Sequence, residues 1–258
     1  MDLSQLAVLC IVALIAALLL FLELGRRIGR HQLARGQGGL ARGAGTAEGA
    51  VFGLLGLLIA FTFSGAAERF EQRRHLTTEE ANAIGTAYLR LELLASQDQM
   101  TLRPLFRDYT KLRAQVYSEA QDFSLTLQRL AASQQLQSRI WTLAVTASQQ
   151  AGAAPQSAML LLPALNEMFD ITTTQHMATQ NHPPAVVFLL LLVLSLIGSL
   201  LIGYEMAANR ARSWLHHVAF ATIMALAMYV IVDLEFPRLG LIRVNSADLV
   251  LKELQQSM

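Results

Sequence analysis

Apolar residues fall into four long runs along the chain, and one long polar stretch separates the second run from the third. The runs cover residues 6–24, 49–67, 185–204 and 213–232. Each is close to the roughly 20 apolar residues that a helix needs to cross the hydrocarbon core of a bilayer. The ionisable residues inside them are Glu23, near the end of the first run, and His216 and His217 in the fourth. The pattern predicts an all-α membrane protein with four transmembrane helices.

The runs divide the chain into four segments. Residues 1–67 form an N-terminal transmembrane hairpin, 68–183 an extramembrane helical bundle, 184–232 a C-terminal transmembrane hairpin and 233–258 a tail. The pair Pro183–Pro184 marks the return to the membrane, because a proline ends one helix and suits the first turn of the next. Pro237 ends the fourth span in the same way, and a short amphipathic helix is expected after it.

The long insert between the second and third spans shows helical periodicity. Apolar residues recur every three or four positions from Ala81 to Ala95, which predicts that the second span continues as a helix with a packing seam. Thr77 and Glu80 have capping-box spacing, so the helix can restart near His75. Pro104 suits the first turn of the next helix, and segments 125–150 and 158–178 are periodic again. We expect a bundle of about four helices.

Arginines and glycines dominate the segment between the first two spans. Its seven glycines between Gly25 and Gly45 predict a flexible loop rather than a helix. The arginines of the two short loops are Arg26, Arg27, Arg30, Arg35 and Arg42, and Arg210 and Arg212. By the positive-inside rule, both loops are cytoplasmic and the insert lies outside, in the periplasm of a cell that has one. The first loop is either a topology anchor only or also a binding site for anionic lipid headgroups.

Composition supports a membrane protein and argues against other classes. The chain has 53% hydrophobic and 15% charged residues with a net charge of +1, and no basic run is interleaved with aromatics, so no nucleic-acid partner is expected. Its single cysteine, Cys10, excludes an intramolecular disulfide. Glu167, Asp170, His176 and His182 are of metal-ligating types, but their spacing matches no known motif and favours a solvated helix face. We expect no enzyme activity, metal or cofactor.

The second span carries one stripe of chemically graded residues. At about 100° per residue, the side chains that share this stripe are Gly53, Leu57, Phe61, Ser64 and Glu68. Apolar groups are followed by a hydroxyl and a carboxylate, which suits the lining of a pore with a hydrophobic constriction and a polar ring. Alternatively, the stripe packs against neighbouring spans, with Gly53, Gly56 and Ala60 allowing close helix contact.

The sequence around this stripe is similar to that of a known family. In the run from Leu58 to Arg74, Phe61 lies eight residues before the pair Arg69–Phe70, as in the pore helix of bestrophins, where such a pair marks the membrane edge. The whole chain resembles the bestrophin-like membrane proteins of bacteria and plants still more, with E-A-N-A-I at 80–84 and an acidic-Φ-x-x-Pro pattern at 233–237.

The resemblance implies a pentameric ion channel with four membrane helices in each subunit, in the inner membrane, with inorganic ions and identical subunits as partners. It would put Phe61, Leu57 and Gly53 at successive levels of an apolar neck, and Gly53 departs from the bulky residues that bestrophins have there. Bestrophins hold their large helical part in the cytoplasm, whereas the arginine distribution puts this insert outside. The bestrophin resemblance implies anions, while a ring of Glu68 favours cations.

A second class of function stays open. The insert of a sensory or scaffold membrane protein would bind a partner or a small ligand and pass a change to the spans. The seam from Ala81 to Ala95 fits this class, because such seams also serve as oligomer interfaces.

Overall fold

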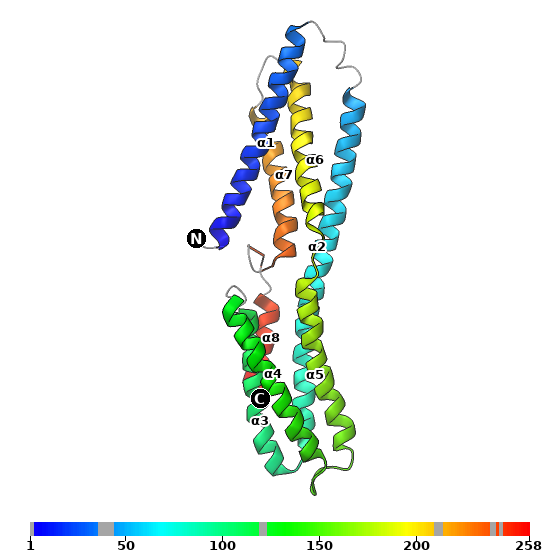
Figure 1. The fold of residues 1–258 in the computed structure, drawn as a ribbon, viewed down its shortest axis with the longest axis vertical. Helices are drawn as coiled ribbons and strands as arrows, with labels where there is room; N and C mark the ends of the chain where they lie inside the picture. The colour runs from blue at the N-terminus through cyan, green and yellow to red at the C-terminus, as the bar shows by residue number, and fades with distance from the viewer. Residues whose placement is uncertain (1–2, 36–43, 119–122, 209–213, 238–240, 243–244) are drawn as a thin grey trace. The chain divides into compact units, whose positions relative to one another are not determined.

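The computed structural model describes residues 3–35, 44–118, 123–208, 214–237, 241–242 and 245–258, and Figure 1 shows its ribbon. The α-helices are α1 (Leu3–Ala34), α2 (Ala44–Leu89), α3 (Ser96–Ser118), α4 (Phe123–Ser148), α5 (Ser157–Gln180), α6 (Ala185–Glu205), α7 (Trp214–Glu235) and α8 (Asn245–Ser257). Short 3-10 helices, η2 (Arg90–Leu93) and η3 (Met206–Ala208), follow α2 and α6. Among these residues no strand occurs, so the predicted all-α class is confirmed.

Four helical stretches are long and apolar enough to cross a membrane. They lie within Ala7–Ala34, Glu48–Leu93, Ser157–Ala208 and Trp214–Glu235, and each contains one of the four predicted runs. The protein is therefore a multi-pass membrane protein by the length and apolar character of its helices.

The chain forms two compact units. Unit 1 comprises Met1–Glu68 and His182–Ile242, and unit 2 comprises Arg69–Asn181 and Arg243–Met258. The tail after α7 is thus divided between them, with Leu241 and Ile242 in unit 1 and α8 in unit 2.

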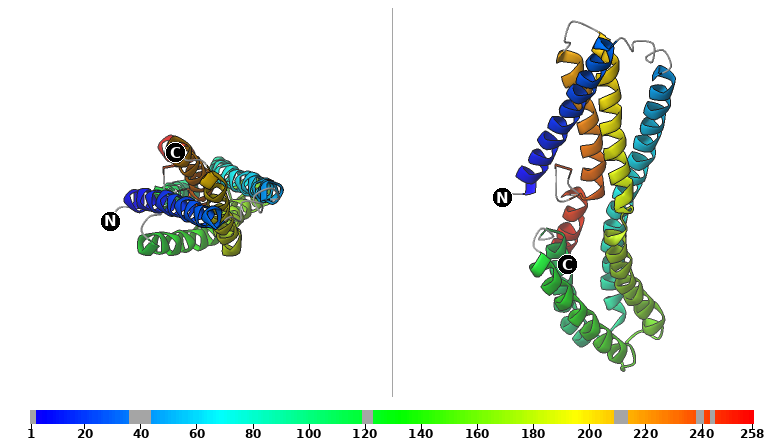
Figure 2. Two further views of the ribbon diagram at one scale, coloured as in Figure 1. Left: turned by 90° about the horizontal axis from the view of Figure 1, so that it is seen from above. Right: turned by 45° about the horizontal axis from the view of Figure 1, so that its top comes forward.

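Unit 1 is held together by close contact between α1 and α6. Figures 1 and 2 show α1, α6 and α7 side by side. A Cβ added at Gly203 would lie 1.9 Å from Leu22 O, and one added at Gly25 would lie 1.9 Å from Leu200 O. Only glycine allows the two backbones to come this close, as small residues commonly do between membrane helices. One to two turns earlier along α1, Leu18 packs against Ala221 and Ala225 of α7.

The predicted loop from Gly25 to Gly45 is wrong over about its first half, because α1 continues to Ala34. Gly29 explains the difference together with Gly25. A Cβ at Gly29 would lie 2.5 Å from Ala207 Cβ and 2.8 Å from Tyr204 O. These glycines therefore serve helix packing rather than chain flexibility, and the contacts offset their poor helix propensity of about 1 kcal/mol each. Residues 36–43 of that prediction lie outside the described part of the chain.

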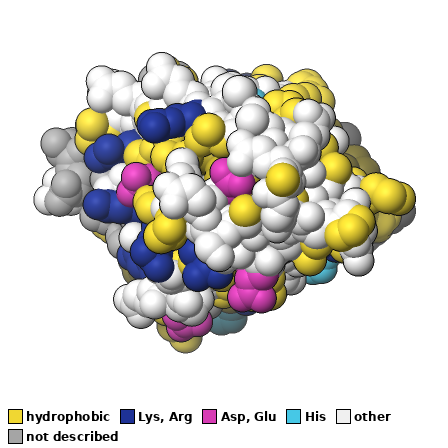
Figure 3. Space-filling view, turned by 90° about the horizontal axis from the view of Figure 1, so that it is seen from below, with side chains coloured by type: hydrophobic (Ala, Val, Ile, Leu, Met, Phe, Trp, Pro, Cys, Tyr) yellow, Lys and Arg dark blue, Asp and Glu magenta, His cyan; other side chains and the backbone are white. Residues whose placement is uncertain are grey.

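Unit 2 has a core built from the second half of α2 and from α3, α4, α5 and α8. Its largest fully buried side chains include Ile84, Phe106, Tyr109, Ile140 and Leu165. The periodic apolar residues of the insert thus lie in this core. Leu251 of α8 is also fully buried, so α8 is part of this core. The view in Figure 3 shows one face of the molecule, on which Lys and Arg side chains gather to one side among mixed polar and apolar groups.

Two local predictions in unit 2 are wrong. α2 runs through His75 without a restart, because Thr77 Oγ1 donates to Arg73 O four residues back instead of capping a new helix. The carboxylate of Glu80 is likewise directed to α3 and not to a cap. Pro104 lies in the ninth position of α3 rather than in its first turn. It is exposed.

Candidate pore-lining face of α2

The membrane half of α2 has one face packed against its own unit. Leu55 and Ala66 are 1% and 0% exposed. Phe52 approaches both neighbouring helices: a Cβ at Gly198 of α6 would lie 3.0 Å from its ring, and the ring meets Phe220 of α7 edge to face with 6.3 Å between centroids. Thr62 Oγ1 donates to Leu58 O at 2.7 Å and so closes its hydrogen bond within the helix. This face positions α2.

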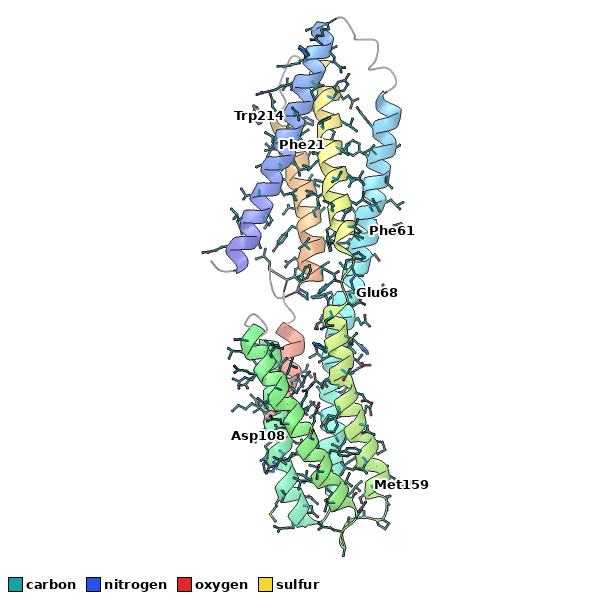
Figure 4. The ribbon with its side chains drawn as sticks, viewed as in Figure 1. Phe21, Phe61, Glu68, Asp108, Met159 and Trp214 are labelled. Carbon is teal, nitrogen blue, oxygen red and sulfur yellow. The ribbon has the colours of Figure 1, made fainter. Side chains whose placement is uncertain are left out.

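The five predicted pore-lining residues lie on the opposite face. At about 100° per residue, the middle of the stripe is roughly 160–180° around the helix from Leu55 and Ala66. Leu57 and Phe61 are 51% and 65% exposed, and Gly53, Ser64 and Glu68 are exposed as well. Figure 4 labels Phe61 on the side of α2 turned away from α6, with Glu68 farther along the same helix. The whole stripe is therefore uncovered in a single chain.

Among the described residues, no helix of the same chain packs on the small residues beside this stripe. A Cβ added at Gly53 or Gly56 would meet no atom within 4 Å, and Ala60 is exposed. These glycines differ in this respect from Gly25, Gly198 and Gly203, which lie against neighbouring helices of the described chain.

The residues that follow the stripe are held by side-chain interactions in unit 2. Arg74 lies over the ring of Phe70, with 5.9 Å from Cζ to the centroid, and pairs with Glu71 at 2.8 Å. Arg73 donates from Nε to Ala178 O and from Nη2 to Asn181 O, both at 3.2 Å. It thereby satisfies backbone carbonyls at the end of α5 that have no partner in the helix. Phe70 of the predicted Arg69–Phe70 pair is half-buried, and so is Arg69.

A buried ion pair in unit 2 is a feature that the sequence reasoning missed. Arg113 of α3 donates from Nε to one oxygen of Glu80 and from Nη2 to the other at 3.3 Å, and the two residues are 3% and 0% exposed. Arg113 Nη2 also donates to Gln175 Oε1 of α5 at 3.0 Å. Gln175 Nε2 in turn donates to Thr77 Oγ1 at 3.4 Å. The network links α2, α3 and α5.

The signal for this pair was present in the sequence. Arg113 follows Phe106 and Tyr109 at the spacing of an apolar helix face, and a charge in such a position needs a partner when it is buried. Glu80 opens the E-A-N-A-I motif. Burial raises the pKa of Tyr109 well above its usual range, and the negative charge of Glu80 raises it further. Tyr109 is thus a neutral phenol that accepts from Gln137 Nε2 at 3.1 Å.

The acidic motif after the fourth span closes unit 1. Asp233 Oδ2 accepts from the backbone N–H groups of Leu241 and Ile242, both at 3.0 Å. Glu235 is fully buried and lies 2.9 Å from Nδ1 of His182, whose ring stacks on Phe236 with 4.5 Å between centroids. The motif therefore fixes the end of α7 to the residues that precede α6.

The candidate metal-ligating residues do not come together. Glu167, Asp170 and His176 are exposed on α5, while His182 belongs to unit 1 and lies against Glu235. In the part of the chain that is described, no three His, Cys, Asp or Glu side chains form a group that could hold a metal ion.

The seam from Ala81 to Ala95 is occupied by unit 2 itself. Ala81, Ile84 and Leu91 are 4%, 0% and 0% exposed and belong to the hydrophobic core. This seam is therefore not a free oligomer interface.

Comparison with known proteins identifies the family. The family model described as "Bestrophin-like domain" matches residues 11–249, which include most of the first predicted span, the three other spans and the whole insert. Comparison with curated proteins and with solved structures gave no match. The chain belongs to the bestrophin-like domain family.

Proposed function

We propose that the protein assembles into a homo-oligomeric ion channel whose pore is lined by the exposed stripe of α2. The observation that carries the proposal is the division of α2 into two faces. One face packs on α6 and α7 through Phe52 and Leu55, and the stripe from Gly53 to Glu68 is open along its whole length.

The order of side chains along the stripe suits conduction better than contact with lipid tails. Leu57 and Phe61 alone would suit either environment. Ser64 and Glu68 lie on the same line and favour water, because a carboxylate facing hydrocarbon is costly. Successive members of the stripe lie roughly 4.5–6 Å apart along the helix axis at 1.5 Å per residue. A ring of Phe61 would form the constriction, and rings of Ser64 and Glu68 the polar part next to it.

Family membership supports the subunit arrangement. By resemblance to bestrophins, five subunits would surround the pore. The arginines of the two short loops, one between the first and second spans and one between the third and fourth, favour an insert on the periplasmic side of a cell inner membrane. The function proposed is passive ion transport rather than catalysis.

Planar-bilayer recording on purified protein tests the proposal once light scattering has established the oligomeric state. A ring-forming oligomer that conducts is expected. Phe61→Ala should raise the single-channel conductance, because it removes the bulk from the constriction.

Phe63→Ala is the matched control. Phe63 is on the same helix and 46% exposed, but it lies roughly 120° from the middle of the stripe, so its loss should leave the conductance unchanged. A monomer or dimer that does not conduct would contradict the channel proposal and would favour the sensory or scaffold function instead. Equal effects of the two substitutions would contradict the assignment of the stripe.

A further inference from the structure

The last turns of α1 extend beyond the apolar run of the first span. That run ends at Leu24, and α1 continues as a helix to Ala34. Ten residues add roughly 15 Å of helix, which is more than the headgroup region on one side of a bilayer occupies. Trp214, 54% exposed at the start of α7, belongs to the same end of unit 1 (Figure 4) and is the kind of residue that concentrates at membrane interfaces.

Packing fixes which face of this extension points outward. Gly25 and Gly29 lie against backbone and side-chain atoms of α6 and η3, and Gln32 Oε1 accepts from Tyr204 OH at 2.5 Å. The opposite face lies roughly 180° around the helix. Its exposed residues are Arg27, Arg30 and His31. Leu24 and Ile28, 44% and 39% exposed, lie roughly 70–110° to one side of its middle, and Arg35, which directly follows α1, is exposed roughly 90° to the same side.

The charge on this outward face is mostly uncompensated. Arg27 pairs with Glu23 at 3.2 Å, in a contact where the arginine side chain is 76% exposed. Neither Arg30 nor Arg35 is in an ion pair with any acidic side chain in the described ranges. The face therefore presents guanidinium groups just beyond the first apolar run, with Arg27 and Arg30 roughly 4.5 and 9 Å past Leu24 along the helix axis.

We propose that this face of α1 binds the phosphate headgroups of anionic phospholipids in the adjoining leaflet. Guanidinium groups bind phosphate oxygens in a bidentate manner, and each basic residue near an anionic surface adds to the attraction. Leu24 and Ile28 provide the apolar border on which the glycerol and upper acyl chain would lie. The contacts of Gly25 and Gly29 with α6 fix the rotation of α1, so the arginine side chains face outward in the absence of lipid.

The test uses the full chain, purified in neutral detergent and depleted of lipid. Thermal unfolding is measured after addition of phosphatidylglycerol, of phosphatidylcholine, or of inorganic phosphate alone. At a lipid concentration 100 times the dissociation constant, phosphatidylglycerol should raise the Tm by about 5–10 °C. Phosphatidylcholine and inorganic phosphate should give little shift. Equal shifts with the two lipids, or with inorganic phosphate, would overturn the proposal.

Variants locate the effect. Replacing Arg27, Arg30 and Arg35 by Gln should abolish the difference between the two lipids, and replacing them by Lys should retain most of it. The control removes the same charge from exposed positions of unit 2, through Lys111→Gln, Arg139→Gln and Lys252→Gln, and should behave as wild type. Detergent-solubilised protein has no membrane orientation. If these arginines served only to set the topology, all variants would therefore show the same Tm shifts with the two lipids, and that result would refute lipid binding. If the Gln variant fails to fold, native mass spectrometry of the wild type still tests the proposal. Phosphatidylglycerol should stay bound to the protein more than phosphatidylcholine, and equal retention of the two lipids would contradict the proposal.

Discussion

Arg113 of α3 and Glu80 of α2 form an ion pair inside the core of unit 2, where their side chains are 3% and 0% exposed. Such a pair is costly to break from one side, because the remaining charge stays buried without its partner. The loss of either partner alone is therefore expected to destabilise the contact between α2 and α3 strongly.

Glu80→Gln should lower the free energy of unfolding of unit 2 by about 3–5 kcal/mol. Thermal unfolding in detergent, followed by circular dichroism, measures it. Glu79→Gln is the control, because Glu79 pairs with His75 at the surface, with side chains 47% and 74% exposed, and such pairs contribute at most about 1 kcal/mol. The double variant Glu80→Leu with Arg113→Met should regain most of the loss. Similar losses in the single and the double variant would contradict this account.

Stability should fall at alkaline pH because of Tyr109. Its pKa is raised in the folded protein, chiefly by burial, so in the unfolded chain it loses its proton first, near pH 10. The contribution of the neutral phenol is fully present below about pH 10 and is lost as the pH rises toward the folded pKa, by about 1.4 kcal/mol per pH unit. The free energy of unfolding, measured at a series of pH values above about 10, should therefore fall more steeply with pH for wild type than for Tyr109→Phe. Parallel pH profiles would show that Tyr109 is not the group responsible.

Gly203→Ala should impair the folding of unit 1. The added Cβ would lie 1.9 Å from Leu22 O, so α1 and α6 would have to separate, at a cost of about 1–3 kcal/mol or more. Gly56→Ala adds the same methyl group where no atom lies within 4 Å and should leave folding intact. The yield of monodisperse protein on size exclusion and the Tm compare the two. A Gly203→Ala protein that matches Gly56→Ala would mean that α1 and α6 are not in this contact.

Glu68→Gln should reduce selectivity for cations if the stripe lines a pore. A ring of exposed carboxylates attracts cations, and the amide removes that charge without changing the size of the side chain. Reversal potentials in a salt gradient measure the change, with Glu167→Gln, an exposed carboxylate on α5, as the control. An unchanged reversal potential would place Glu68 outside the conduction path.

The spans and the helical class could be predicted because runs of about 20 apolar residues have one common structural explanation. The outward direction of the α2 stripe could be predicted only in part. Spacing shows that Gly53, Leu57 and Phe61 share a face, but whether that face is covered depends on where α6 and α7 pack. Conduction through it stays a prediction.

The errors arose where a distant segment decides the local structure. Gly25 and Gly29 resemble loop residues until α6, far along the sequence, supplies the backbone against which they lie. Thr77 and Glu80 have the spacing of a helix cap, yet Arg113 and Gln175 provide the partners that they use instead. The position of Arg113 on an apolar helix face signals that it needs a partner, but nothing local in the sequence identifies that partner as Glu80.

The burial of Leu251 of α8 in the core of unit 2 constrains how the chain is made. Two spans, α6 and α7, separate α8 from the rest of that core. Since α8 and the insert must meet on one side of the bilayer, the chain between them has to cross an even number of times. During synthesis, the apolar surface that α8 will cover stays exposed until both spans have emerged and inserted. Biogenesis of the helical bundle of unit 2 is thereby coupled to insertion of the last membrane hairpin, and a chain arrested before α7 would present that surface to chaperones and proteases.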